Sequence, residues 1–269
     1  MSTNPTPRPS PAEMVDTVED VLNHTLALGR QLTEDDAERP TDCPGWTVRD
    51  QFAHIVGLGQ LLEGAPAPHT ELPDLDHVSS DLDRFMEGPV HARRGLPLVG
   101  VVDELAGYIP RRLAHLREIA DQDGDPEIIS PLGEPQSFAR VIPIHITDIW
   151  GHETDIRRAV GREPRLDCAA GRHCLAQTLR AWSALLPRNV EGTDAELTVT
   201  VEGGDVGVGD SATITLGAGG RAASLSGSGA ALVRAGFGRG SVAERLADLR
   251  FEGDQSVLDA IVAHLAFTP

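Results

Sequence analysis

Residues 141–160, VIPIHITDIWGHETDIRRAV, combine apolar residues at helical spacing with an acidic residue and a histidine four positions apart. Positions i and i+4 of an α-helix project from the same face, so Asp148 and His152 can direct a carboxylate oxygen and an imidazole nitrogen toward one point. Gly161 follows as a natural end of the helix. The stretch therefore predicts a helix with two potential metal ligands on one face.

A second helix, predicted over residues 48–63, supplies a third candidate ligand. Thr47 and Asp50 form a capping-box pattern at its start, and apolar residues then go nearly all the way round it, which is typical of a helix with little solvent contact. His54 is therefore predicted to face protein rather than water. Two imidazoles and one carboxylate can hold a divalent cation and leave coordination positions open, as catalytic sites do.

Each candidate ligand also has an ordinary structural interpretation. An isolated histidine on an apolar helix, such as His54, is usually a hydrogen-bonded core residue. An i,i+4 pair such as Asp148 and His152 usually stabilises an exposed helix by roughly a few tenths of a kcal/mol. The isoleucines and the tryptophan around this pair favour burial instead, and buried polar groups need partners.

Two neighbouring residues leave further alternatives open. His145 lies three residues before Asp148, as a possible fourth ligand or a hydrogen-bond donor to one, although Pro143 is expected to place it close to the helix start. Cys43 precedes the second helix and could be a nucleophile, but a Cys-Pro-Gly-Trp turn is more often structural.

The rest of the pattern predicts an α+β fold with two domains. Further helices are predicted over residues 10–32, 80–86, 97–121 and 168–186, and strands over 195–201 and 212–216. Residues 221–225 and 249–252 could add strands, and 230–237 and 255–267 could add helices. We expect a flexible arm over residues 1–9, a helical bundle over 10–189, and a smaller α+β domain over 190–269.

Composition excludes several classes of function. The 23 basic residues are all Arg, against 41 acidic ones, and the net charge of −18 disfavours binding to nucleic acid or to an anionic membrane. The absence of Lys excludes Schiff-base and P-loop chemistry. Three cysteines without CxxC spacing indicate neither a disulfide framework nor a thiolate zinc site. Without an export signal or a long apolar stretch, we expect a cytoplasmic protein.

Two stretches together resemble a known family. Residues 43–55, CPGWTVRDQFAHI, and 148–161, DIWGHETDIRRAVG, are similar to motifs of the mycothiol-dependent maleylpyruvate isomerase family, part of the DinB-like superfamily. The resemblance covers nearly the whole chain. It implies an N-terminal DinB-like four-helix bundle that binds a divalent metal, commonly zinc, and a smaller C-terminal α/β domain.

The resemblance also implies roles for single residues. It places the metal ligands at His54, Asp148 and His152, with Asp148 where the isomerase has the longer Glu, a change that could alter the metal's position or preference. It further implies a catalytic arginine in the second domain, for which Arg239 is the first candidate and Arg234 the second.

A reaction class follows from this resemblance. A cation beside a thiol stabilises the thiolate and lowers its pKa. We therefore expect an enzyme that uses mycothiol, as a metal-bound thiolate, to attack a small electrophilic substrate, as an S-transferase or a cis–trans isomerase. Arg239 or Arg234 would hold an anionic group of that substrate. We expect a monomer or a homodimer.

Other classes of function stay open from the residues alone. Water on the same cation would give a hydrolase, and the ligand set also suits a non-haem iron oxygenase, although a helical domain is not the usual oxygenase barrel. A metal-stabilised bundle could also act as a non-catalytic binding or stress-response module. Thiol-dependent turnover distinguishes the first hypothesis from all of these.

Overall fold

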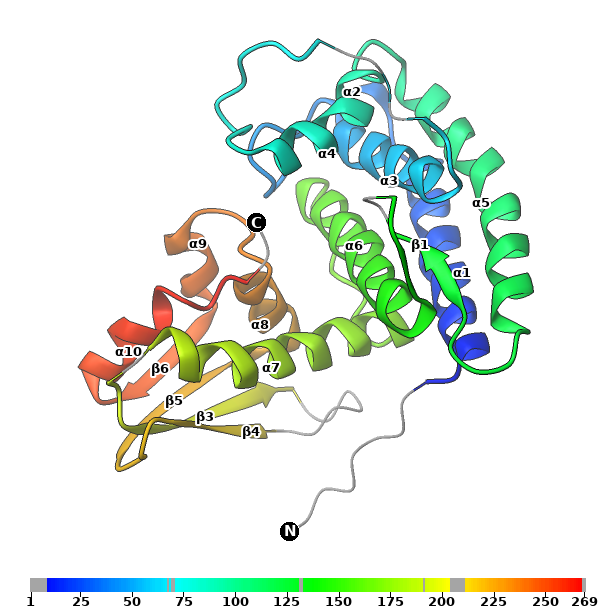
Figure 1. Ribbon diagram of the computed structural model, residues 1–269. Coiled ribbons are helices and arrows are strands. Elements are labelled where there is room, and N and C mark those ends of the chain that lie inside the picture. Colours follow the sequence, from blue (N-terminus) through cyan, green and yellow to red (C-terminus); the bar gives the residue numbers. More distant parts are fainter. Residues whose placement is uncertain are drawn as a thin grey trace. The chain divides into compact units, whose positions relative to one another are not determined.

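The computed structural model describes residues 9–66, 68, 71–130, 133–190, 192–203 and 211–267. The chain forms two compact units, shown as ribbons in Figure 1. The first unit takes in residues up to Thr41 and from Gly45 to Gly161; the second takes in Asp42–Pro44 and Arg162–Pro269. The flexible arm expected over residues 1–9 lies, apart from Pro9, outside the described residues.

The first unit is built on four long helices: α1 (Pro11–Gly29), α3 (Val48–Leu62), α5 (Leu98–Ala120) and α6 (Phe138–Ala159). Both α1 and α3 pack against α5 and against α6. This pattern places α5 and α6 at opposite corners of a four-helix bundle (Figure 1). The helical bundle predicted for the N-terminal region is confirmed.

Shorter elements complete the first unit. They are α2 (Glu34–Ala37), α4 (Asp81–His91) and a two-stranded antiparallel sheet of β1 (Glu127–Ile129) and β2 (Pro135–Ser137). Of these, α4 packs against α3.

The predicted capping box of α3 is present. The Thr47 hydroxyl accepts the Asp50 backbone N–H, and the Asp50 carboxylate accepts the Thr47 backbone N–H. Asp thus replaces the usual Glu without loss of either bond. Nearly every residue of α3 is buried, His54 included, as its apolar pattern predicts.

The start of α6 differs from the prediction. The helix begins at Phe138 rather than at about residue 141, so Pro143 lies inside it. The preceding loop makes this possible, because Pro126 and Asp125 accept the backbone N–H groups of Phe138 and Ala139. His145 is consequently two turns into the helix and buried, where the sequence had placed it near the helix start.

The second unit is a four-stranded sheet with helices on one face. Its strands are β3 (Ala195–Glu202), β4 (Ser211–Leu216), β5 (Arg221–Ser228) and β6 (Leu249–Gly253), in the order β4-β3-β5-β6. Only the pair β3 and β5 is parallel. Its helices are α7 (Ala169–Asn189), α8 (Gly229–Gly236), α9 (Val242–Ala247) and α10 (Gln255–Val262). Alternate residues of β3 are buried, as a sheet covered on one face requires.

The boundary between the units lies between Gly161 and Arg162, whereas the sequence placed it between residues 189 and 190. The two boundaries differ because α7, which lies between them, belongs to the second unit. This helix packs against α8 and β4, so its buried face belongs to the core of the second unit. Its helical pattern indicated the element correctly but carried no information about which core it joins.

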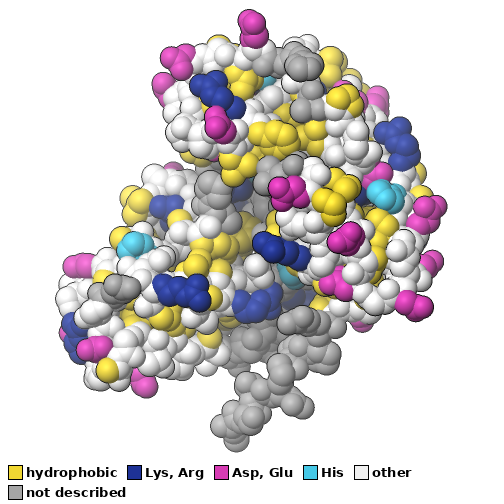
Figure 2. Space-filling model, viewed as in Figure 1, with side chains coloured by type: hydrophobic (Ala, Val, Ile, Leu, Met, Phe, Trp, Pro, Cys, Tyr) yellow, Lys and Arg dark blue, Asp and Glu magenta, His cyan; other side chains and the backbone are white. Residues whose placement is uncertain are grey.

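Acidic side chains are distributed over the visible face of the molecule and do not gather into one continuous patch (Figure 2). Figure 2 shows Asp and Glu side chains spread across that face, with arginines between them. Among the described residues, no helix combines the length and hydropathy needed to cross a bilayer.

Candidate metal centre

The structure brings together the three predicted ligands, His54, Asp148 and His152. The Nε2 atoms of His54 and His152 each lie 3.4 Å from Asp148 Oδ1, and the two ring centroids are 4.4 Å apart. One ligand atom from each residue lies within 4.8 Å of the others. The i,i+4 spacing on α6 and the packing of α3 against α6 together produce this convergence.

Gln51 fixes which nitrogen of His152 faces Asp148. Its side-chain oxygen lies 2.5 Å from His152 Nδ1, and its amide nitrogen donates to the Thr41 hydroxyl at 2.6 Å. Because the amide oxygen accepts, His152 donates from Nδ1 and keeps the Nε2 lone pair on the side of Asp148. Sequence reasoning missed Gln51, although a polar residue three positions before His54 on an apolar helix was a usable signal.

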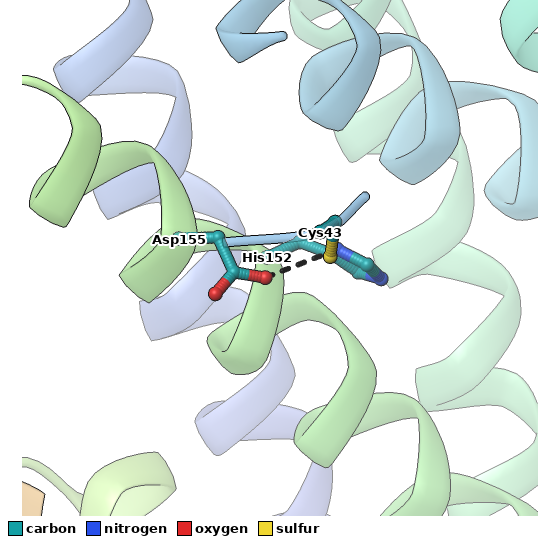
Figure 3. Close-up of side chains that lie close together, drawn as sticks. All are labelled: Cys43, His152 and Asp155. Carbon is teal, nitrogen blue, oxygen red and sulfur yellow. Dashed lines mark ion pairs between the residues drawn. The ribbon is translucent and has the colours of Figure 1, made fainter. Parts of the chain in front are cut away.

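A second acidic side chain lies on the far side of the His152 ring. Asp155 Oδ2 is 3.8 Å from His152 Nδ1, and Figure 3 draws this ion pair. Both residues belong to α6, three positions apart, and Asp155 is buried. A carboxylate behind a ligating histidine is a common arrangement, because it orients the ring and raises the basicity of the ligating nitrogen.

Trp46 covers the two histidines. Its ring centroid lies 4.9 Å from that of His54 and 5.8 Å from that of His152. The indole N–H donates to Glu87 at 2.8 Å, and Arg94 forms an ion pair with the same carboxylate. The tryptophan of the CPGW turn is thus held in place by α4, and it shields one side of the site from water.

Within the part of the chain that the structure describes, Asp148 presents an unpaired carboxylate oxygen beside the two histidines. Oδ2 is buried and has no hydrogen-bond partner among the described residues, while the side chain as a whole is 24% exposed. Burial by itself would raise the pKa of this carboxyl group, but the facing His54 and His152 hold the pKa well below its usual value. The group is therefore ionised at neutral pH.

The donor set fits a divalent cation. The Nε2 atoms of His54 and His152 both lie 3.4 Å from one oxygen of the Asp148 carboxylate, so a divalent cation bound at this point would have two imidazoles and one carboxylate as ligands. Tetrahedral ligands at zinc bond lengths are separated by about 3.4 Å, which matches both of these contacts.

Comparison with known proteins agrees with this geometry. Residues 17–157, more than half of the chain, match the family described as "Mycothiol maleylpyruvate isomerase N-terminal domain". The chain belongs to this family.

Solved structures show the same relationship at the level of the fold. Crystal structures of "the mycothiol-dependent maleylpyruvate isomerase" and of a mutant of it superpose with TM-scores of 0.56 and 0.55 at 16% sequence identity, covering 87% of this chain and 91% of the other. None of the curated proteins compared with this chain matches it. The α+β fold predicted from the resemblance to the maleylpyruvate isomerase family is confirmed.

His145, the possible fourth ligand, does not join the group of atoms that gather at Asp148. It is buried, and neither ring nitrogen has a hydrogen-bond partner among the described residues. Burial, reinforced by the positive charge of Arg112, lowers the pKa of His145 to about 3, so the ring is neutral.

The remaining site candidates of this family member lie in the second unit. Arg234 donates from Nε to Asp42 at 3.1 Å and from Nη1 to the Glu244 carbonyl oxygen, while Arg239 follows α8 and bonds through its backbone N–H to the Arg234 carbonyl oxygen. Cys43 lies in the short segment Asp42–Pro44 and forms no disulfide. The catalytic roles of Arg239 and Arg234 stay predictions.

Proposed function

We propose that this protein is a divalent-metal-dependent enzyme that activates a low-molecular-weight thiol, mycothiol, for attack on a small electrophilic substrate. The reaction would be an S-transfer or a cis–trans isomerisation of the maleylpyruvate isomerase type. The observation that carries the proposal is the convergence of His54, Asp148 and His152, in which one buried carboxylate oxygen has no hydrogen-bond partner within the described part of the chain. Membership of the family supports the choice of thiol.

His54, Asp148 and His152 would hold the cation, and zinc suits two imidazoles and one carboxylate. Three protein ligands are one fewer than a closed structural site uses. The cation, when bound, would lower the pKa of an incoming thiol so that the nucleophilic thiolate is present at neutral pH.

The residues around the ligands would prepare this site. Gln51 holds His152 in one tautomer, Trp46 excludes water from one side, and the part-exposed Asp148 marks where a ligand can enter. In the S-transfer, the thiol proton leaves to solvent and a carbon–sulfur bond forms, while a carbon–oxygen bond of an epoxide or the π bond of a conjugated alkene breaks and the resulting anion takes up a proton from solvent. In the isomerisation, the sulfur adds to a conjugated alkene, the former double bond rotates, and the sulfur leaves again with its electron pair.

Elemental analysis of the purified protein tests the ligand assignment. We expect about one equivalent of a divalent metal in the wild type and a loss of most of it in His54→Ala and in His152→Ala, because each variant removes one of three ligands. His24→Ala is the matched control, since His24 is an exposed histidine on α1. Unchanged metal content in both ligand variants would refute the assignment.

The thiol dependence needs a separate measurement. Conjugated and epoxide acceptors are incubated with the enzyme, with and without mycothiol, and adducts and isomers are identified by mass spectrometry. Thiol-dependent turnover is expected. Turnover without a thiol would instead indicate a hydrolase, and a stoichiometric metal without any turnover would indicate a non-catalytic module.

A further inference from the structure

Several buried polar atoms in the core of the bundle have no hydrogen-bond partner among the described residues. Tyr108 and Arg112 of α5 and His145 of α6 are almost completely buried. Among the described residues, no hydrogen-bond partner exists for Tyr108 Oη, Arg112 Nε and Nη2, both ring nitrogens of His145, or Asp148 Oδ2. The function proposed above uses none of the first three residues.

These side chains belong to one neighbourhood. Tyr108 and Arg112 are four residues apart on α5, and His145 and Asp148 are three apart on α6, so each pair shares a helix face. The charges of Arg112 and Asp148 both act on Tyr108 and on His145: the pKa of Tyr108 is raised and that of His145 lowered, in each case mainly by burial.

Gly59 of α3 shows how closely the phenol is held. A Cβ atom at this position would lie 2.4 Å from Tyr108 Cζ and 2.7 Å from its hydroxyl oxygen. The glycine therefore leaves just the room that the phenol needs against α3, and the hydroxyl is fixed in the core rather than turned to solvent.

So many unpaired polar atoms in one buried neighbourhood of the described chain indicate that a bound molecule can supply their hydrogen-bond partners. Native interiors satisfy most of their buried donors, because an unpaired buried donor is unfavourable. The missing partner must supply acceptors for Arg112, because a guanidinium only donates; the Tyr108 hydroxyl can donate or accept, and the neutral His145 ring offers one donor and one acceptor. A group with two acceptor oxygens meets the requirement of Arg112 better than an apolar group does.

The arrangement of Arg112 narrows the class of this group. Its Nη1 donates to Glu63 Oε1 at 2.7 Å, and this bond leaves Nε and Nη2 unpaired. These two N–H groups lie along one edge of the planar guanidinium and form the fork that binds a carboxylate through two parallel hydrogen bonds.

We propose that Tyr108, Arg112 and His145 bind a carboxylate group of the small-molecule substrate in the core of the bundle, next to the candidate metal centre. That this ligand is the enzyme's substrate rests on the function proposed above. Binding of a carboxylate requires only these three side chains. Asp148 is the part-exposed member of the neighbourhood, so a bound acceptor would direct its carboxylate inward and its electrophilic carbon toward His54 and His152.

Tyr108→Phe tests this proposal with the smallest disturbance. It removes one hydroxyl and keeps the ring against Gly59, whereas replacing Arg112 would leave Glu63 without its partner and could unfold the bundle. Propionate is the probe, with the isosteric neutral propionamide as its comparison, and both are titrated calorimetrically into the purified protein. Metal content and unfolding are measured on the same samples.

We expect the wild type to bind propionate more tightly than propionamide, and Tyr108→Phe to weaken propionate about tenfold, as loss of a hydrogen bond to a charged group predicts. Stability and metal content should not fall in this variant, because the lost hydroxyl bonds to none of the residues that the structure describes. His115→Gln is the matched control: His115 also contacts Glu63 but its side chain is 42% exposed, and its replacement should leave propionate affinity unchanged.

Two results would overturn the proposal. The first is equal affinity of the wild type for propionate and propionamide, which would mean that water alone satisfies these atoms. The second is wild-type affinity for propionate in Tyr108→Phe. A repeat of the titration after chelation separates this inference from the proposed function: binding that persists without metal supports the Arg112 site even if thiol-dependent turnover fails, and binding that disappears with the metal assigns the carboxylate to the cation instead and refutes the site.

Discussion

Gln51 decides which nitrogen of His152 faces the candidate metal centre. In a neutral imidazole one nitrogen donates and the other accepts, and the amide oxygen at Nδ1 selects the tautomer with Nε2 as acceptor. The amide nitrogen of Gln51 is in turn occupied by Thr41, so the amide cannot rotate without losing a hydrogen bond. Gln51 and Thr41 together thus fix the orientation of the His152 ring.

Gln51→Leu should therefore lower metal affinity without touching a ligand. We expect a 10- to 100-fold increase in the dissociation constant for zinc, the range typical of lost partners of ligating histidines, measured by competition with a chromophoric chelator. Gln51→Glu keeps an acceptor at Nδ1 and should retain affinity near that of the wild type. Gln31→Leu, at an exposed position after α1, is the control; equal affinities in Gln51→Leu and Gln31→Leu would show that Gln51 does not orient the ring.

At the scale of elements, α3 and α5 approach closely because α3 carries glycine opposite Tyr108. Gly59→Ala should lower the free energy of unfolding by about 1–2 kcal/mol, since overpacking costs about 1–3 kcal/mol and the better helix propensity of Ala returns up to about 1 kcal/mol. Urea denaturation measures this change. In Gly107→Ala, at an exposed position of α5 with open space around it, only the propensity gain remains, so stability should rise. Stabilisation by both substitutions would contradict the close packing of Tyr108.

Site residues that share one helix could be predicted from the sequence, whereas residues brought together by packing between helices could not. Asp148 and His152 share a face through the local geometry of one helix, so their spacing was sufficient, and the apolar surroundings of His54 predicted its burial. Tyr108 and Arg112 gave no such signal. They share a neighbourhood with His145 only because α1 and α3 both pack against α5 and α6, and these are contacts between helices distant in sequence.

At the scale of the whole molecule, the sequence did not predict which unit α7 joins or at which residue α6 begins. The amphipathic pattern of α7 predicts a buried face but not the core that buries it, and the structure assigns that face to α8 and β4. The early start of α6 depends on acceptors in the preceding loop, which no periodicity records. Each element could be predicted from local pattern, whereas its membership of a unit required the tertiary contacts.

Two separate cores imply that metal removal should affect one unit only. The three ligands belong to α3 and α6, so a bound cation adds stability to the bundle, by about 2.7 kcal/mol at a free concentration one hundred times the dissociation constant. In hydrogen exchange read out by mass spectrometry, chelation should therefore raise exchange rates up to about 100-fold in peptides from Val48–Leu62 and Phe138–Ala159. Peptides from β3 and β5 should not change and serve as the internal control, because their core contains none of the ligands. An equal loss of protection in both units would mean that the two cores unfold together, and an unchanged pattern throughout would mean that the histidines and Asp148 are not joined by a metal.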